Sequence, residues 1–454
     1  MPSNSLRDKD QAYALHPYTD LRAHERCGPM VITRGEGVRV FDENGKGYIE
    51  GLAGLWCVSL GYTQPRLVEA ARKQMDTLPF SHVFRHKAHE PGIELAEKLI
   101  EMAPVPMSKV FFANSGSEAN DTVIKMIWYY SNALGRPEKK KIISRVKAYH
   151  GVTVASASLT RLPANNVDFD LPIDRIIHTT CPHAYHEAEP GESDEVFAAR
   201  LAKNLEDLIL SEGPDTIAAF IAEPVMGAGG VIVPPETYFS KIVPVCRKYD
   251  ILVVADEVIC GFYRTGNLWG SQTFGIEPDI LTCAKALSSA YLPISAVMVN
   301  DRVFQAIADN SAKLGTFGHG YTYSAHPVPA AVALETLALY EDLKIGEHVA
   351  EVAPVMQAHL KSLGAHPLVG EARGVGMIGA LELVEDKAAR KNFDPKRGIG
   401  AKVMDTMEKH GALIRAMMND SLGFAPPLVI TKAELDELFG IVRTALDEVA
   451  AEVL

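Results

Sequence analysis

Cysteine is scarce in this 454-residue sequence, and its placement excludes a disulfide-built protein. The six cysteines include no Cys-x-x-Cys pair and no closely spaced framework. Proteins that fold in oxidising compartments around disulfides show such a framework, so this usage is typical of a reducing compartment. The first ten residues are polar and contain no apolar signal region. We therefore expect a cytoplasmic protein.

Long apolar runs and basic clusters are also missing. No stretch reaches membrane-spanning length without a charge, so no membrane segment is predicted. The net charge is −12 and the only basic run is 139–141, which argues against nucleic-acid partners because these need clustered basic surface. The length exceeds that of a usual single core, and two lobes are therefore expected.

Two apolar segments end in residues of opposite charge. The run 251–255 is continuously aliphatic and β-branched, as in a central parallel strand covered on both faces, and it ends at Asp256 and Glu257. The segment 279–284 repeats the pattern and ends at Lys285. Open α/β sheets place ligands at the carboxyl ends of their strands, so a buried positive partner is expected for the acid there. An amine nucleophile beside a fixed negative charge suits pyridoxal phosphate, whose aldehyde needs the amine and whose ring nitrogen needs the acid.

A strand-like segment, 109–113, runs into a turn of small and hydroxyl residues, 114–120, and then into a helical pattern. Free N–H groups, a positive helix end and two hydroxyls could together bind an anion. The same residues could instead form an ordinary helix N-cap at Ser115 or Ser117. The residues alone leave both readings open.

Four ordered motifs resemble those of the class III (omega) aminotransferases of pyridoxal-phosphate fold-type I. They are Ala255–Val258, Gly261–Gly266, Ala284–Ser289 and Tyr291–Pro293. The resemblance covers nearly the whole chain from about Tyr18. It is greatest to enzymes that move amino groups from amines or β-alanine to pyruvate.

The resemblance implies an α/β fold whose large domain has a mostly parallel seven-stranded sheet flanked by helices. A smaller α+β domain would come from both termini. We expect residues 1–60 to form the N-terminal part of the small domain, 61–325 the large domain and 326–454 the C-terminal part.

The resemblance also implies roles for individual residues. Lys285 and Asp256 would be catalytic, with Lys285 as carrier of the cofactor and mover of a proton. The residues expected to bind the cofactor are Ser115, Gly116, Ser117, Tyr149, Glu223, Asp256, Val258, Lys285 and Thr322. Those expected to bind the substrate are Tyr18, Trp56, Phe84 and Arg415. Trp56 could alternatively cap a core edge and Arg415 could be a surface residue of a strand.

Phe84 and Thr322 correspond to positions that act in the neighbouring subunit, so at least a homodimer is expected; dimer and tetramer are not distinguished. The substrates would be a small amine donor and a keto acid. A related aminomutase or dialkylglycine-type decarboxylase is the alternative function, and a non-catalytic cofactor-binding protein is a third. Many family members have glycine where this chain has Tyr263, Ala290 and Ala325.

Three other motifs are declined. The histidines at 82, 86 and 89 have a helix-like spacing but no carboxylate or cysteine to complete a ligand set, and the segment 181–186 offers too few ligands, so it is expected to be a loop. No metal is predicted. The glycine pattern 374–379 fits G-x-G-x-x-G but precedes an alternating strand pattern rather than a helix, so a dinucleotide site is rejected.

Overall fold

A seven-stranded sheet forms the centre of the computed structural model, which describes residues 5–454. Its strand order is β4-β10-β9-β8-β7-β5-β6. Only β10 runs antiparallel to its neighbours, so the expected mostly parallel sheet is confirmed. The strands are β4 (Lys109–Ala113), β5 (Lys141–Arg145), β6 (Ile176–Thr179), β7 (Ile217–Ala222), β8 (Leu252–Asp256), β9 (Ile280–Cys283) and β10 (Ser295–Val299).

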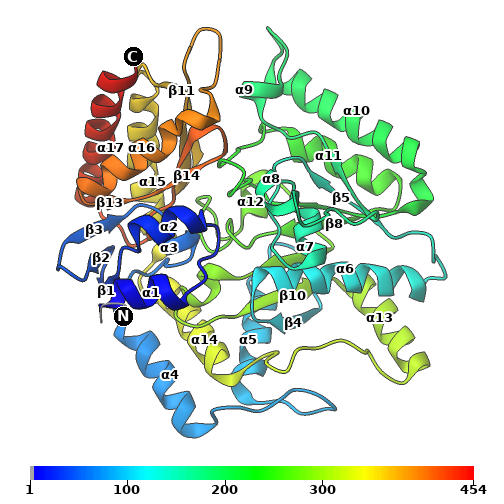
Figure 1. The fold of residues 1–454 in the computed structure, drawn as a ribbon. Coiled ribbons are helices and arrows are strands. Elements are labelled where there is room, and N and C mark those ends of the chain that lie inside the picture. Colours follow the sequence, from blue (N-terminus) through cyan, green and yellow to red (C-terminus); the bar gives the residue numbers. More distant parts are fainter. Residues whose placement is uncertain (1–4) are drawn as a thin grey trace.

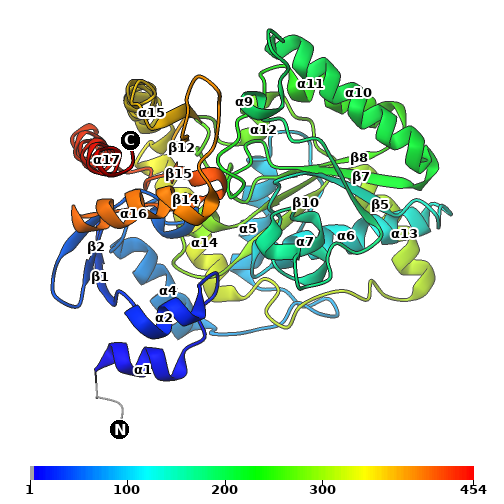
Figure 2. The same cartoon turned by 45° about the horizontal axis from the view of Figure 1, so that its top comes forward.

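Two helix layers cover the faces of this sheet (Figure 2). In β8, Leu252 and Val254 pack into the core beneath α6 (Gly116–Ala133) and α13 (Asp301–Leu314). Val253, pointing the other way, packs with α10 (Asp194–Glu212) and α11 (Tyr238–Lys248). A strand with apolar residues on both faces needs cover on both, which explains the unbroken apolar run at this point in the sequence.

Two smaller sheets form the second lobe, in which the N-terminal strands lie beside the C-terminal part of the chain (Figure 1). In one sheet β13 (Ala412–Leu413) lies parallel to β3 (Gly47–Glu50), next to β2 (Arg39–Asp42) and β1 (Ile32–Glu36). The other is the antiparallel order β11-β12-β15-β14. Its strands and the helices packed nearby are β11 (Val369–Val375), β12 (Ile378–Leu383), β14 (Arg415–Met417), β15 (Ser421–Phe424), α15 (Ile345–Leu363), α16 (Ile399–Lys409) and α17 (Lys432–Val453).

The alanine-rich helix α14 (Pro327–Asp342) packs against α4 (Pro65–Thr77) and α5 (Glu90–Glu101) and leads into α15. The domain boundaries stay predictions. The remaining short helices are α1 (Leu6–Tyr13), α2 (Leu21–Cys27), α3 (Ala53–Trp56), α7 (Val154–Leu159), α8 (Pro163–Asn166), α9 (Ala184–Glu187) and α12 (Gly270–Phe274), with 3-10 turns at Pro214–Thr216, Lys285–Ser288, Pro395–Arg397 and Met418–Asp420. Across residues 5–454, every helix is too short or too polar to cross a bilayer.

One expected strand is divided in the structure. The pattern Ala412–Arg415 predicted a single short strand, but the chain passes at Ile414 from β13 in one sheet to β14 in the other. The rejected glycine pattern forms the β11–β12 hairpin, in which Gly374 pairs with Gly379. The strand expected after the glycine pattern, in place of a helix, is therefore confirmed as β12.

Candidate active site

The carboxylate of Asp256 is held rigidly at the end of β8. Its Oδ2 accepts hydrogen bonds from Asn120 Nδ2 at 2.8 Å and from His150 Nδ1 at 2.7 Å, and its Oδ1 accepts one from the Val258 amide at 3.1 Å. Burial works to raise the pKa of Asp256, but the bond from His150 and these other donors outweigh it and lower the pKa. The acid is therefore fixed as a carboxylate.

Lys285 lies just beyond β9, next along the sheet from β8, and begins a 3-10 turn. Its backbone is in the left-handed region, with φ of 48°. Burial lowers the pKa of its amine, and the charge of Asp256 partly restores it. A lowered pKa leaves more of the amine unprotonated, as a nucleophile requires.

The N-terminus of α6, with the turn before it, lies at the same cavity. Ser115 is the N-cap, since its Oγ accepts from the Glu118 amide at 3.1 Å. Ser117 Oγ accepts from the Val152 amide, also at 3.1 Å. A Cβ on Gly116 would come within 3.1 Å of Val258, so a larger residue would crowd this turn. Both readings of the turn thus apply: it caps the helix, and it leaves a helix N-terminus free to bind an anion.

Seven of the predicted residues line one cavity between these elements: Gly116, Ser117, Tyr149, Glu223, Asp256, Val258 and Lys285. Glu223 is buried, and its carboxylate accepts from the amides of Tyr149 and Gly227, both at 3.1 Å. It therefore fixes the loop that carries Tyr149. An anion cradle, an aromatic ring, a carboxylate and an amine around one cavity fit a phosphorylated pyridine aldehyde.

A second group surrounds Arg415, on β14. The Arg415 guanidinium carbon lies 5.5 Å from the ring centre of Tyr18 and 5.7 Å from that of Trp56. Trp56 also faces the cavity, since Lys285 Nζ lies 5.9 Å from its ring centre. Within residues 5–454 no carboxylate forms an ion pair with Arg415, which leaves its guanidinium able to bind an anionic substrate.

Phe84 and Thr322 are not part of this chain's cavity. Thr322 is exposed and Phe84 is 43% exposed. The Phe84 ring lies against Gly320, two residues from Thr322. The structure thus brings these two residues to one surface but not to Lys285.

The sequence predicted a buried positive partner for the acids at the end of β8, and for Glu257 this prediction is wrong. Its carboxylate accepts from the amides of Gly270 and Ser271 and from the Ser271 hydroxyl, all at the start of α12. Burial raises its pKa to about 7. Neutral hydrogen-bond donors and a raised pKa thus stabilise the buried Glu257 carboxyl group, in place of the expected positive side chain.

The three positions at which many family members have glycine share one backbone feature in this chain. Tyr263, Ala290 and Ala325 have φ of 70°, 64° and 52°, in the left-handed region that favours glycine. The chain therefore keeps the backbone that a glycine would adopt, at the cost of local strain.

Histidines of the two motifs rejected as metal sites form hydrogen bonds or ion pairs within the protein. His89 caps α5 and its Nε2 contacts the Ala325 carbonyl oxygen at 2.6 Å. The segment expected to be a loop at 181–186 includes the start of short α9, and His183 lies 2.8 Å from Glu371 on β11. The Arg373 guanidinium also bonds this Glu371, so a cation already compensates it.

Sequence reasoning missed the residues that hold Asp256. Asn120 and His150 stand in the motifs around Gly116 and Tyr149, but nothing in their spacing showed that both reach the end of β8. The buried Nε2 of His150 has no hydrogen-bond partner.

Comparisons with known proteins show the family and the fold. The model of the aminotransferase class-III family matches residues 22–446. The mitochondrial gamma aminobutyrate transaminase 1 of Solanum lycopersicum is 52% identical over 440 residues, which are 97% of this chain and 85% of the relative. The vanillin aminotransferase of Capsicum chinense is 49% identical over 426 residues, 94% of this chain and 93% of the relative. The omega transaminase from Pseudomonas jessenii in complex with PMP superposes with a TM-score of 0.97 at 56% identity, over 99% of each chain.

Proposed function

Since this chain belongs to the class III aminotransferases, enzymes that use pyridoxal 5'-phosphate, we propose that it moves an amino group from an amine or ω-amino acid to pyruvate. The observation that carries the proposal is Arg415, whose guanidinium lies between Tyr18 and Trp56 without a carboxylate partner in the described chain. Such a group can bind the carboxylate of a keto acid and swing away for an uncharged amine.

The cofactor supplies an electron sink when bound. Around it we assign roles to the chain's own residues. Asp256 would keep a negative charge at the ring nitrogen. The Lys285 amine would hold the cofactor by its aldehyde group and would afterwards move a proton at the substrate carbon. Gly116, Ser117 and the N-terminus of α6 would bind the phosphate. The Ser115 hydroxyl would also donate a hydrogen bond to the phosphate, because its bond with the Glu118 amide uses only a lone pair of the oxygen.

Tyr149 and Val258 would enclose the ring, and Glu223 would hold the Tyr149 loop in place. On the substrate side, Trp56 would form the wall between Lys285 and Arg415. A structural neighbour with a tryptophan replaced by glycine was engineered for asymmetric synthesis of enantiopure bulky amines, which supports a tryptophan wall of this kind.

The donor is an amine or an ω-amino acid such as β-alanine. Curated relatives are named for gamma aminobutyrate and for vanillin, so a 4-carbon ω-amino acid belongs among the donors to be tested. Cytoplasmic localisation stays a prediction from cysteine usage.

A homodimer with shared sites is part of the proposal. Phe84 and Thr322 lie on one surface away from their own cavity, and Phe80 and Tyr323, 41% and 58% exposed, lie beside each other with ring centres 5.8 Å apart. Exposed aromatic rings gathered at one place are typical of an interface. Hybrids of Lys285→Ala and Thr322→Ala subunits should recover activity that neither parent has; an active monomer would contradict the shared site.

A donor panel tests the function. Gamma aminobutyrate, β-alanine and an aromatic amine are each offered with pyruvate or with 2-oxoglutarate, and both products are measured. We expect alanine to form in step with consumption of the donor. Release of carbon dioxide from a donor would favour the related decarboxylase, and transfer to 2-oxoglutarate alone would reject pyruvate.

A further inference from the structure

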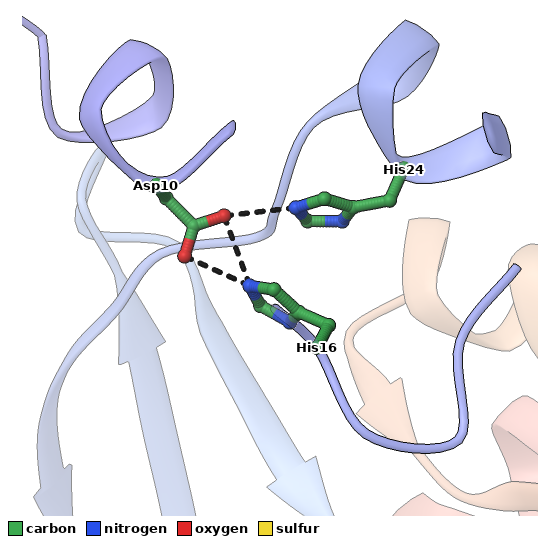
Figure 3. A group of neighbouring side chains, drawn as sticks. All are labelled: Asp10, His16 and His24. Atoms are coloured by element: carbon green, nitrogen blue, oxygen red, sulfur yellow. Dashed lines mark hydrogen bonds and ion pairs between the residues drawn. The ribbon is translucent and has the colours of Figure 1, made fainter. Parts of the chain in front are cut away.

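Three side chains from separate parts of the N-terminal segment converge outside the active site (Figure 3). Asp10 belongs to α1, His24 to α2, and His16 to the loop between them. Asp10 Oδ1 lies 3.0 Å from His16 Nε2 and 2.9 Å from His24 Nε2, and the two imidazole ring centres are 4.1 Å apart. One carboxylate oxygen thus meets two imidazole nitrogens at once.

We propose that Asp10, His16 and His24 form a binding site for a divalent transition-metal ion, with Zn²⁺ as its ligand of first choice. Two imidazoles and one carboxylate are a donor set that such ions bind, with water completing the shell. Donor atoms around a tetrahedral zinc ion stand about 3.3 Å apart, given bonds of about 2.0 to 2.1 Å. The two separations between Asp10 and the histidine nitrogens need to open by only a few tenths of an ångström, and the three donor atoms all lie within 4.8 Å of one another.

The local surroundings leave space for a bound water. Asp10 and His16 are partly exposed, so an ion there keeps an open side toward solvent. An ion would take the Nε2 lone pair of each imidazole, so each ring would carry its proton on Nδ1. The carboxylate and the two neutral rings together would carry one negative charge against the charge of the ion.

The second group of this composition makes a useful contrast. His183 and His186 meet Glu382, but the Arg373 guanidinium lies 2.9 Å from that same carboxylate. A metal ion there would stand beside a buried cation. No side-chain cation is recorded on the Asp10 carboxylate, whose recorded hydrogen-bond partners in the described chain are the two histidines.

The ion would act as a clamp on a segment that has little else to hold it. Helix α1 has no buried residue and is attached to α2 by polar bonds, among them Arg7 to the Cys27 carbonyl oxygen at 2.6 Å. The loop closed by the ion carries Tyr18, whose hydroxyl accepts from Asn165 and whose ring lies by Arg415. Metal binding would therefore fix the side of the substrate site that Tyr18 forms.

Equilibrium dialysis of the holoenzyme against Zn²⁺, with metal analysis, tests the site. Asp10→Asn and His16→Gln should each weaken binding more than about 100-fold, since loss of a direct ligand exceeds the usual cost of losing a supporting group. The matched control is His410→Gln, which removes a surface histidine bonded at 2.8 Å to a single carboxylate, that of Glu448. It should bind Zn²⁺ like the wild type.

Amide hydrogen exchange supplies a second readout that does not depend on activity. Zn²⁺ should slow exchange across residues 6–27 in the wild type and in the His410 variant, but not in the Asp10 or His16 variants. Zinc binding that is equal in all four proteins, or no binding by the wild type, would overturn the proposal. Because the readouts concern binding and exchange, their failure would leave the aminotransferase assignment untouched.

Discussion

Replacing Arg415 tests the proposal that one site accepts both a keto acid and an amine that lacks a carboxylate. In the free enzyme the guanidinium has two aromatic neighbours, Tyr18 and Trp56, and no ion pair with a carboxylate among the described residues. Arg415→Ala therefore breaks no salt bridge. It removes only cation–π contacts of about 0.5–1 kcal/mol each before any substrate arrives.

The effect should appear when a carboxylate must be bound. A charge-assisted pair lost from a partly buried site costs about 2–5 kcal/mol, which corresponds to a KM for pyruvate raised about 30-fold or more. The half-reaction with a hydrophobic amine has no carboxylate and should change by less than about 3-fold. Arg415→Lys keeps the charge but loses the planar fork, so its effect on pyruvate should be intermediate.

Single-turnover measurements separate the two halves. Loss of the cofactor's colour with the amine reports the first, and return of the colour with pyruvate reports the second. An equal loss in both halves would show that Arg415 is structural, and the carboxylate receptor would have to lie elsewhere.

Three further outcomes are expected. His150→Ala removes the largest influence that lowers the pKa of Asp256, so the acid limb of the kcat/KM profile should move to higher pH; an unchanged limb would mean that His150 does not tune the carboxylate. Ala290→Gly relieves a left-handed backbone and should raise stability by up to about 1 kcal/mol, whereas Ala199→Gly in the exposed middle of α10 should lower it by about 1 kcal/mol, both from thermal midpoints. Burial raises the pKa of Glu50 from 4.5 to about 7, so the folded state favours the protonated acid. The contribution of Glu50 to stability should therefore fall by up to about 3 kcal/mol as pH rises from 4.5 to 7. Glu50→Gln should remove this part of the dependence of stability on pH. A variant whose stability depends on pH as steeply as that of the wild type would refute the raised pKa of Glu50.

The strands and helices of the central sheet could be read from the sequence because each has a pattern of its own. The unbroken apolar run of β8 needs cover on both faces, and α4 begins at Pro65, since proline suits the first position of a helix. The division of residues 412–415 between two sheets could not be predicted from the sequence. It depends on which strands this segment pairs with, and not on its local pattern.

The same distinction holds for the site. Lys285 and Asp256 stand at strand ends, where position alone indicates a ligand. Asn120 and His150 reach Asp256 only through the packing of α6 and the loop after β5, and their residue types have no spacing that marks them. The pairing of Asp10 with His16 and His24 likewise depends on how α1 and α2 pack.

The central claim is that this aminotransferase carries pyridoxal phosphate on Lys285. Borohydride treatment of the purified yellow protein, followed by peptide mapping, tests it most directly. We expect the reduced cofactor on the peptide that contains Lys285, and a Lys285→Ala protein that carries no reducible label and has no turnover. Label on a different lysine, or turnover at the normal rate by Lys285→Ala, would contradict the claim.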